Sequence, residues 1–238
     1  MNVAVIFAGG VGKRMNSKTK PKQFLELHGK PIIIYTIEKF ENHPEIDGII
    51  VVCVKEWIDY LKELINKYGI SKVVSVVPGG KNGQESIYHG LRKCKEYFKE
   101  NCIVLLHDGV RPIIDGNVIS ENIECVKING SAITVSAATE TIALQENDKQ
   151  IGKILERKKC MIAKAPQCFM LEDILDAHEK AIKENRFEFV DSASLMQFYG
   201  YELFTVECGV DNIKITTPTD FYIFRAILDS NENSQIFG

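Results

Sequence analysis

The feature that most constrains the fold is a repeated alternation between short apolar runs and longer amphipathic segments. Continuous apolar runs of about six residues are typical of strands buried on both faces of a sheet. The segments between them, such as 57–68, carry apolar residues at helical spacing. This alternation predicts an α/β fold: a single Rossmann-like, mostly parallel sheet with helices on both faces. The predicted strands are Val3–Ala8, Gly48–Val54, Val73–Val77, Cys102–Leu106 and Ser131–Ala138.

Length and composition exclude several functions. The 238 residues contain no repeat or linker, so we expect a single domain over residues 1–238. The formal net charge of −3 argues against wholesale nucleic-acid binding, and no apolar run reaches the ~18 residues of a membrane span. The seven cysteines are scattered without Cys-x-x-Cys spacing. We therefore expect no zinc or redox motif, and reduced thiols in the cytoplasm.

The loop after the first predicted strand combines glycines with cations. Gly9, Gly10 and Gly12 allow the backbone to turn sharply and to approach a ligand closely. Backbone N–H groups that glycine leaves accessible, together with several cations, form a phosphate-binding site. An ordinary glycine turn with a solvated lysine face is the alternative. The cations are Lys13, Arg14, Lys18, Lys20 and Lys22.

Single residues exclude the two commonest phosphate loops. A Walker loop requires Ser or Thr after Gly-Lys, but Gly12-Lys13 is followed by Arg14. A dinucleotide-binding loop requires a third glycine at the position that Met15 occupies. The loop therefore belongs to a different class of phosphate site.

Three further polar clusters occur along the chain, and two of them directly follow predicted strands. Pro78–Ser86 is a glycine-rich turn that leads into a helix, and His107–Pro112 directly follows the next strand. His107 itself is interpreted as a half-buried residue at the strand end. Gly209–Phe221 carries Lys214 on an alternating, strand-like run and then opens the last helix. Because parallel α/β sheets bind ligands at the carboxyl ends of their strands, we expect these clusters to meet at one site.

Several motifs occur in the order of one known family. Gly-Gly-x-Gly-x-Arg-Met, followed by Pro-Lys-Gln-Phe, resembles the opening signature of the sugar-phosphate nucleotidyltransferases, in their cytidylyltransferase branch. The chain also resembles further motifs of this branch, at residues 107–112, 165–169, 191–194 and 212–220. Members of the branch make CDP-methylerythritol or CDP-ribitol. The resemblance covers residues 3 to about 228 and implies transfer of CMP from CTP to a small polyol phosphate.

The resemblance also implies a role for each matched residue. Lys22 and Lys214 would flank the α-phosphate of CTP, and Arg14 would contact the β and γ groups, so these three would be catalytic. Asp108 would lie near the phosphates and bind Mg²⁺, which needs few carboxylates. The nucleotide would be bound by Ala8, Gly9, Gly10, Gly12, Lys13, Arg14, Lys22, Gly80, Lys81, Ser86 and Asp108. The acceptor would be bound by Asp108, Arg111, Thr141, Arg157, Asp191 and Lys214.

A polar hairpin over residues 139–160 is expected to project as a β-arm. Its tip is predicted at 146–148 and its return strand at 149–155. In the resembling family such an arm crosses to a second subunit and helps to complete that subunit's acceptor site. The resemblance therefore implies a homodimer in which Thr141 and Arg157 act across the interface, with Arg157 binding the acceptor's phosphate in bidentate fashion. A charged, exposed arm without this role is the alternative.

Four residues depart from the family pattern, the mildest being Glu140, where an aspartate is usual. Gly83 stands where an arginine is usual, which affects how cytosine or triphosphate would be bound. Ala165 and Val190 stand where methylerythritol-phosphate enzymes carry hydroxyl groups. The loss of two hydroxyls leaves fewer hydrogen bonds for that acceptor. Ribitol 5-phosphate is therefore the favoured acceptor, methylerythritol 4-phosphate is the alternative, and another sugar phosphate is a further one.

Two other classes of function stay open. The chain could be a dinucleotide-binding oxidoreductase subunit, although Met15 and the cation cluster disagree with that class. It could also be a nucleotide-binding dimer without catalysis, as the missing arginine at Gly83 would allow. The presence of Lys22, Asp108 and Lys214 argues against this reading.

Overall fold

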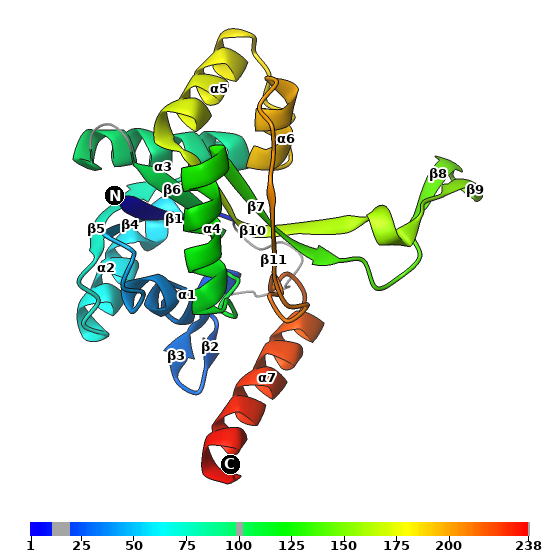
Figure 1. Ribbon diagram of the computed structural model, residues 1–238. Helices are drawn as coiled ribbons and strands as arrows, with labels where there is room; N and C mark the ends of the chain where they lie inside the picture. Colours follow the sequence, from blue (N-terminus) through cyan, green and yellow to red (C-terminus); the bar gives the residue numbers. More distant parts are fainter. Residues whose placement is uncertain (11–19, 99–101, 238) are drawn as a thin grey trace.

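A computed structural model of the chain describes residues 1–10, 20–98 and 102–237, the last seven by backbone alone. Its central sheet has seven strands in the order β11-β7-β10-β6-β1-β4-β5 (Figure 1). Neighbouring strands run parallel except β10, which is antiparallel to both β6 and β7. The strands are β1 (Asn2–Ala8), β4 (Gly48–Cys53), β5 (Val73–Pro78), β6 (Ile103–Asp108), β7 (Ser131–Ala137), β10 (Met161–Met170) and β11 (Thr205–Glu207).

Helices cover both faces of this sheet, as the sequence predicts. Side chains alternate along a strand, so Ala4 and Ile6 of β1 pack into one core while Val3 and Val5 pack into the other. The first core is completed by α1 (Ile32–Glu41), α2 (Ile58–Lys67) and α4 (Gly116–Asn129). The second is completed by α3 (Gly83–Phe98), α5 (Leu171–Lys183) and α6 (Ser192–Phe198).

The ends of several elements differ from the predicted ones. Pro31 is the N-cap of α1, and it pairs in a small hairpin of β2 (Glu26–Leu27) and β3 (Lys30–Pro31). A short 3₁₀ helix, η3 (Lys55–Trp57), precedes α2. The helix α3 begins at Gly83, three residues before the predicted start. The strand β6 continues to Asp108, so this carboxylate stands on the last residue of a strand and not on the loop after it.

The predicted strand around Lys214 is wrong. Residues 208–217 contain no strand, and β11 lies earlier in the chain. The backbone of this segment bonds to a loop: the Ile215 N–H donates to the Val110 carbonyl at 2.9 Å. The alternation of apolar and polar residues around Lys214 therefore occurs in an irregular segment and not in a strand. This segment ends where α7 (Pro218–Phe237) begins.

Two elements project from the body of the molecule (Figure 1). The strands β8 (Ala143–Asn147) and β9 (Gln150–Ile154) form a separate two-stranded sheet in which every residue is exposed, close to the predicted hairpin. The helix α7 is anchored by Phe224, which packs with Val110 and Ile215. None of the helices in the described ranges is both long and apolar enough to cross a membrane.

The order of the strands creates a crevice. The chain passes from β1 to β4 and β5 on one side of the sheet, and then returns to place β6 on the other side of β1. The connections that leave β1 and β6 therefore diverge at the carboxyl ends of these strands. Ligands of open α/β sheets bind at this switch point.

Candidate active site

A pocket of about 590 Å³ lies at the carboxyl ends of β1 and β6. It brings together most of the predicted site residues from segments far apart in the chain. Gly12, Lys13 and Arg14 lie outside the described residues, so the structure places none of these three. The predicted residues that line the pocket are Ala8, Gly9, Gly10, Lys22, Gly80, Lys81, Ser86, Asp108, Arg111, Asp191 and Lys214.

The two glycine-rich loops meet at one side of this pocket. A Cβ added to Gly79 would lie 3.5 Å from the Cα of Gly9 and 3.2 Å from the hydroxyl of Ser86. The Ser86 hydroxyl accepts from the Gly80 N–H at 2.9 Å and donates to the Asn82 carbonyl at 2.8 Å. Glycine therefore permits the close approach of the two loops, and Ser86 holds the second loop in its turn.

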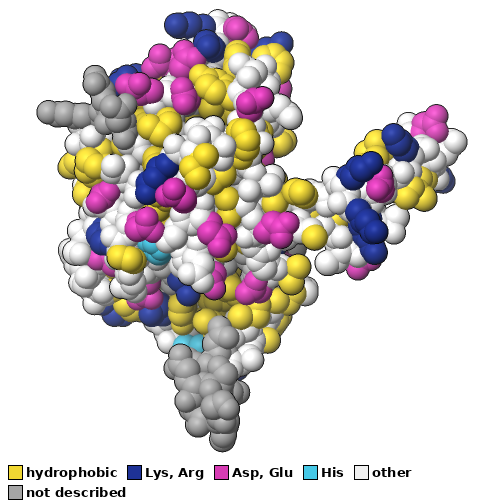
Figure 2. Space-filling model, viewed as in Figure 1, with side chains coloured by type: hydrophobic (Ala, Val, Ile, Leu, Met, Phe, Trp, Pro, Cys, Tyr) yellow, Lys and Arg dark blue, Asp and Glu magenta, His cyan; other side chains and the backbone are white. Residues whose placement is uncertain are grey.

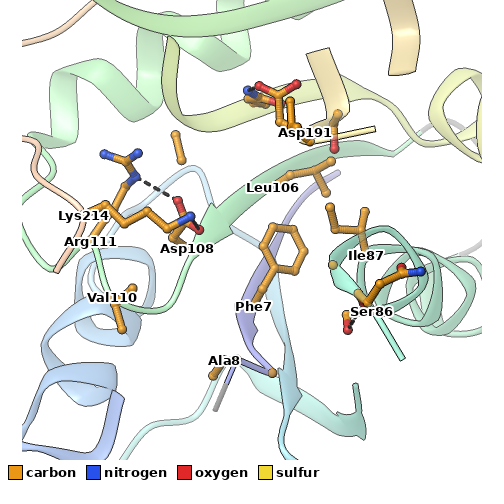
Figure 3. Close-up of a pocket in the computed structure, with 18 of the residues that line it drawn as sticks. Phe7, Ala8, Ser86, Ile87, Leu106, Asp108, Val110, Arg111, Asp191 and Lys214 are labelled. Atoms are coloured by element: carbon orange, nitrogen blue, oxygen red, sulfur yellow. Dashed lines mark hydrogen bonds and ion pairs between the residues drawn. The ribbon is translucent and has the colours of Figure 1, made fainter. Parts of the chain in front are cut away.

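Three charged side chains converge at another side (Figure 3). Asp108 Oδ2 accepts from Arg111 Nε at 2.9 Å, and Asp108 Oδ1 lies 2.7 Å from Lys214 Nζ. Burial would raise the pKa of Asp108, but the charges of Lys214 and Arg111 outweigh it and lower this pKa to about 2. The carboxylate is therefore ionised at neutral pH and holds two cations that come from different loops.

The loop that carries Lys214 is positioned by hydrogen bonds at both ends. Arg111 Nη1 donates to the Asn212 carbonyl at 2.9 Å, which joins this loop to the one after β6. Asp220 Oδ2 accepts from the N–H groups of Thr216 and Thr217 at 2.8 and 2.7 Å. Lys214 thus extends from a braced backbone, while its own side chain stays 43% exposed toward the pocket.

His107 is fully buried, whereas the sequence interpretation made it half-buried. Its Nε2 lies 3.1 Å from the Arg111 carbonyl, and its ring packs edge-on against Phe40. Burial lowers the pKa of His107 to about 4, so the ring is neutral at pH 7. His107 therefore supports the loop of Arg111 and does not reach the pocket.

Asp191 occupies the side of the pocket formed by α6. It is the N-cap of this helix: its Oδ1 accepts from the Ser194 N–H at 2.9 Å. Its Oδ2 accepts from Gln167 Nε2 at 2.9 Å, and Gln167 Oε1 accepts from the Ala193 N–H at 2.9 Å. The Asp191 carboxylate is fixed in place by these bonds.

Several further residues that line the pocket were not selected from the sequence, among them the polar residues Gln23, Lys164 and Gln167. The buried Gln23 donates to the carbonyl of Ala8 and so ties Lys22 to the end of β1. Gln23 and Gln167 lie inside motifs that were recognised, so their position next to selected residues was an available signal. Lys164 lies just outside its motif, and its position next to Ala165 was the one signal for it.

Thr141 and Arg157 do not line the pocket of their own chain. Arg157 opens the short 3₁₀ helix η4 (Arg157–Lys159), and its Nη1 donates to the Thr139 carbonyl at 3.2 Å. Both residues belong to the base of the projecting arm. Within one chain, the structure does not bring either residue to the pocket that Lys214 lines.

The residues fit a magnesium ion only if the substrate supplies most of its ligands. Within the described ranges, no group of three His, Cys, Asp or Glu residues could hold a metal ion. Mg²⁺ commonly binds through one or two carboxylates together with substrate phosphates and water. Asp108 can supply such a carboxylate oxygen beside phosphates in the pocket.

Together, the crevice and the two glycine-rich loops define an α/β enzyme of the nucleotide-binding class. Over residues 2–230 the chain matches the family model described as IspD: 2-C-methyl-D-erythritol 4-phosphate cytidylyltransferase. The chain belongs to this family, and it is a CTP-dependent nucleotidyltransferase.

Curated relatives and solved structures agree with this assignment. A ribitol-5-phosphate cytidylyltransferase of Vibrio parahaemolyticus is 54% identical over the whole of both chains. A 2-C-methyl-D-erythritol 4-phosphate cytidylyltransferase of Clostridium botulinum is 38% identical, covering 96% of this chain and 97% of its own. The crystal structure of 4-diphosphocytidyl-2C-methyl-D-erythritol synthase from Anaerococcus prevotii is 27% identical with a TM-score of 0.82, over 96% of each chain.

Proposed function

We propose that this enzyme transfers CMP from CTP to ribitol 5-phosphate, forming a CDP-polyol and pyrophosphate. The observation that carries this proposal is the cluster of Asp108, Arg111 and Lys214, which faces the two glycine-rich loops across one pocket. The identity of 54% to a relative named ribitol-5-phosphate cytidylyltransferase supports the choice of acceptor.

The reaction is an in-line displacement at phosphorus. An oxygen of the acceptor's phosphate attacks the α-phosphorus of CTP, the bond from this phosphorus to the bridging oxygen breaks, and pyrophosphate leaves. Both reactants are anions, so catalysis depends on neutralising charge and aligning the two groups. Lys22 and Lys214 line the pocket from opposite ends of the chain and can stabilise the charge of the five-coordinate phosphorus.

Asp108 keeps the cations in position for this step. Its ionised carboxylate contacts both Arg111 and Lys214, so Lys214 is held at the pocket before substrate enters. Mg²⁺, bound through the triphosphate with Asp108 as a carboxylate ligand, would neutralise further phosphate charge. Gly9 and Gly10 line the other side of the pocket, where their backbone N–H groups would donate to the phosphates.

The acceptor preference follows from hydroxyl groups that this chain lacks. Ala165 is buried at the pocket wall, and Val190 is 92% exposed at its rim. Neither side chain can donate a hydrogen bond to a polyol. Methylerythritol 4-phosphate is therefore the second candidate, and the relative of that name is the more distant one at 38% identity.

The assembly that best explains the arm is a homodimer. Apolar side chains on and beside the arm are exposed, among them Leu144 at 50%, Ile151 at 64% and Ile154 at 62%. Lys and Arg side chains also gather along it (Figure 2). Burial against a second copy would cover the apolar residues and would bring Arg157 to the partner's anionic acceptor.

Cytoplasmic location stays a prediction; all seven cysteines are free thiols.

Pyrophosphate release tests the proposed function. Purified enzyme is given CTP and Mg²⁺ with ribitol 5-phosphate or methylerythritol 4-phosphate in parallel. We expect turnover with ribitol 5-phosphate and a kcat/KM at least about tenfold lower with methylerythritol 4-phosphate. Preference for the second acceptor would overturn the proposed substrate. If neither acceptor causes pyrophosphate release, transfer to these two polyol phosphates would be contradicted.

A further inference from the structure

Lys164 is a cation of the pocket that the reaction described above does not use. It lies on β10, where the pairing with β7 shifts register between Ala163 and Gln167. Such an irregularity releases residues from the ladder and changes the direction of their side chains. Ala163, Lys164 and Ala165 consequently all line the pocket, beside Asp191 and Lys214.

The ammonium group of Lys164 is held by neutral partners. Its Nζ donates to the carbonyl of Val210 at 3.0 Å and lies 3.4 Å from the carbonyl of Gly209. With the described residues, Lys164 forms no ion pair. Burial lowers the pKa of Lys164; Cys208 partly offsets this effect, the charge of Arg111 lowers the pKa further, and Asp211 raises it slightly. The ammonium group is therefore held in place as a hydrogen-bond donor. Among the described residues, no carboxylate contacts its charge.

The lining of the pocket has an excess of positive charge that suits a phosphate. Its cations are Lys22, Lys81, Arg111, Lys164 and Lys214, and its carboxylates are Asp108, which pairs with Arg111 and Lys214, and Asp191. The described lining therefore carries three more positive than negative charges. A phosphate monoester carries between one and a half and two negative charges at about pH 7. The polyol hydroxyls are neutral and could not balance this excess.

We propose that Lys164 binds the phosphate group of the acceptor, within the same chain that binds the nucleotide. The location of Lys164 in the pocket favours contact with the acceptor rather than with the triphosphate. Lys164 adjoins Ala165, on the predicted acceptor side, whereas the two glycine-rich loops follow β1 and precede α3. This assignment rests on the proposed function and adds a residue that determines affinity for the acceptor. It differs from the role of Arg157, which would act from the second subunit.

Steady-state kinetics of two variants test the assignment. Lys164→Met removes the charge at similar length, and Lys164→Arg keeps it. For Lys164→Met we expect the KM for ribitol 5-phosphate to rise about 10- to 100-fold, because a hydrogen bond to a charged group is lost, while the KM for CTP stays within about twofold. Lys164→Arg should restore the KM for the acceptor to within about threefold. Lys127→Met, on the outer surface of α4, is the matched control.

Chemical footprinting gives an answer that needs no variant. Wild-type enzyme is acetylated with acetic anhydride, with and without inorganic phosphate, and the extent of modification at Lys164 is measured by mass spectrometry. We expect phosphate to protect Lys164 and to leave Lys127 unchanged. Equal modification of Lys164 with and without phosphate would overturn the assignment, even if Lys164→Met does not fold.

The two proposals fail in different ways. Turnover of ribitol 5-phosphate by the wild type, with an unchanged acceptor KM in Lys164→Met, would overturn the role of Lys164 and leave the proposed function intact. An inactive wild type whose Lys164 is protected by phosphate would overturn the acceptor and leave a phosphate-binding lysine.

Discussion

The carboxylate of Asp108 is bonded on one oxygen to Arg111 and on the other to Lys214. Its position explains why the loop after β6 and the loop before α7 form one wall of the pocket. Arg111 is buried and directs a second bond to the Asn212 carbonyl. Loss of the Asp108 charge would leave this guanidinium without its charged partner, which is costly in a buried site. Asp108 therefore has a structural role beside its predicted contact with Mg²⁺.

At the same scale, two of the lysines that line the pocket, Lys22 and Lys214, are expected to dominate turnover. Replacement of Lys22 or Lys214 by Ala should each lower kcat about 10²- to 10³-fold, the usual effect of losing a donor to transition-state charge. Pyrophosphate release at saturating substrates measures this change. Lys127→Ala is the control and should keep wild-type kcat. Turnover near the wild-type value in either pocket variant would remove that lysine from the mechanism.

A histidine outside the pocket predicts how stability depends on pH. His178 is 1% exposed beside Tyr88, and both of its ring nitrogens lack a hydrogen-bond partner among the described residues. Burial lowers the pKa of His178 to about 4, below the ordinary value of 6.5. Between these values the unfolded chain binds a proton that the folded chain does not. The free energy of unfolding should therefore fall as the pH falls below 6.5, by about 2 kcal/mol at pH 5 from this residue.

Denaturant titration at pH 7.5 and pH 5.0 measures this effect. His178→Leu should reduce the loss of stability between the two pH values by about 2 kcal/mol, whatever its stability at pH 7.5. His28→Gln, at an exposed histidine, is the control variant. An unchanged pH dependence in His178→Leu would show that this imidazole does not carry the effect.

At the scale of elements, the start of α3 determines what surrounds the nucleotide. Gly83 is the first residue of this helix and lines the pocket. A Cβ built on Gly83 would meet no atom within 4 Å among the described residues. A longer side chain therefore has room here, at the position where the resembling enzymes usually carry an arginine.

Gly83→Arg should restore a contact to the nucleotide. The added cation at the pocket wall is expected to lower the KM for CTP about three- to tenfold. It should also stabilise α3 by about 0.5–1 kcal/mol, because glycine loses more conformational freedom on folding. Gly83→Ala is the matched control: it should show the gain in thermal stability without the change in KM. A KM for CTP equal to that of wild type would contradict the proposed contact.

At the scale of the whole molecule, the structure separates a nucleotide pocket from an arm that points away from it. The pocket lies at the switch point of the seven-stranded sheet, whereas β8 and β9 share no strand pairing with that sheet. In the proposed dimer, Arg157 would therefore contribute to the site of the second copy. The proposed dimer joins body and arm from different subunits into each site.

Complementation between variants tests this sharing. Arg157→Ala and Lys214→Ala should each be impaired alone. Co-expressed, they should form mixed dimers in which one of the two sites has both residues intact, restoring roughly a quarter of wild-type activity if subunits pair at random. Pyrophosphate release from the purified mixture is the measurement. Activity no higher than the mean of the two single variants would rule out an arm that acts on its partner.

Sequence pattern by itself determined the class of fold, five of the seven strands of the sheet, the arm and most of the pocket; it did not predict β10 or β11. These features follow from local properties: apolar runs that suit buried strands, and glycine or charged residues directly after them. It did not determine that residues 208–217 form an irregular loop, because alternation alone cannot show whether a neighbouring strand is present.

Only the tertiary structure decided how the pieces combine. The pairing of Asp108 with Lys214, the insertion of antiparallel β10 between β6 and β7, and the entry of Lys164 into the pocket all join segments distant in the chain. Such contacts depend on how strands pair and where their register shifts. Lys164 illustrates the reason. The sequence shows that this residue carries a positive charge, but the direction of its side chain is set by the irregular pairing between β7 and β10.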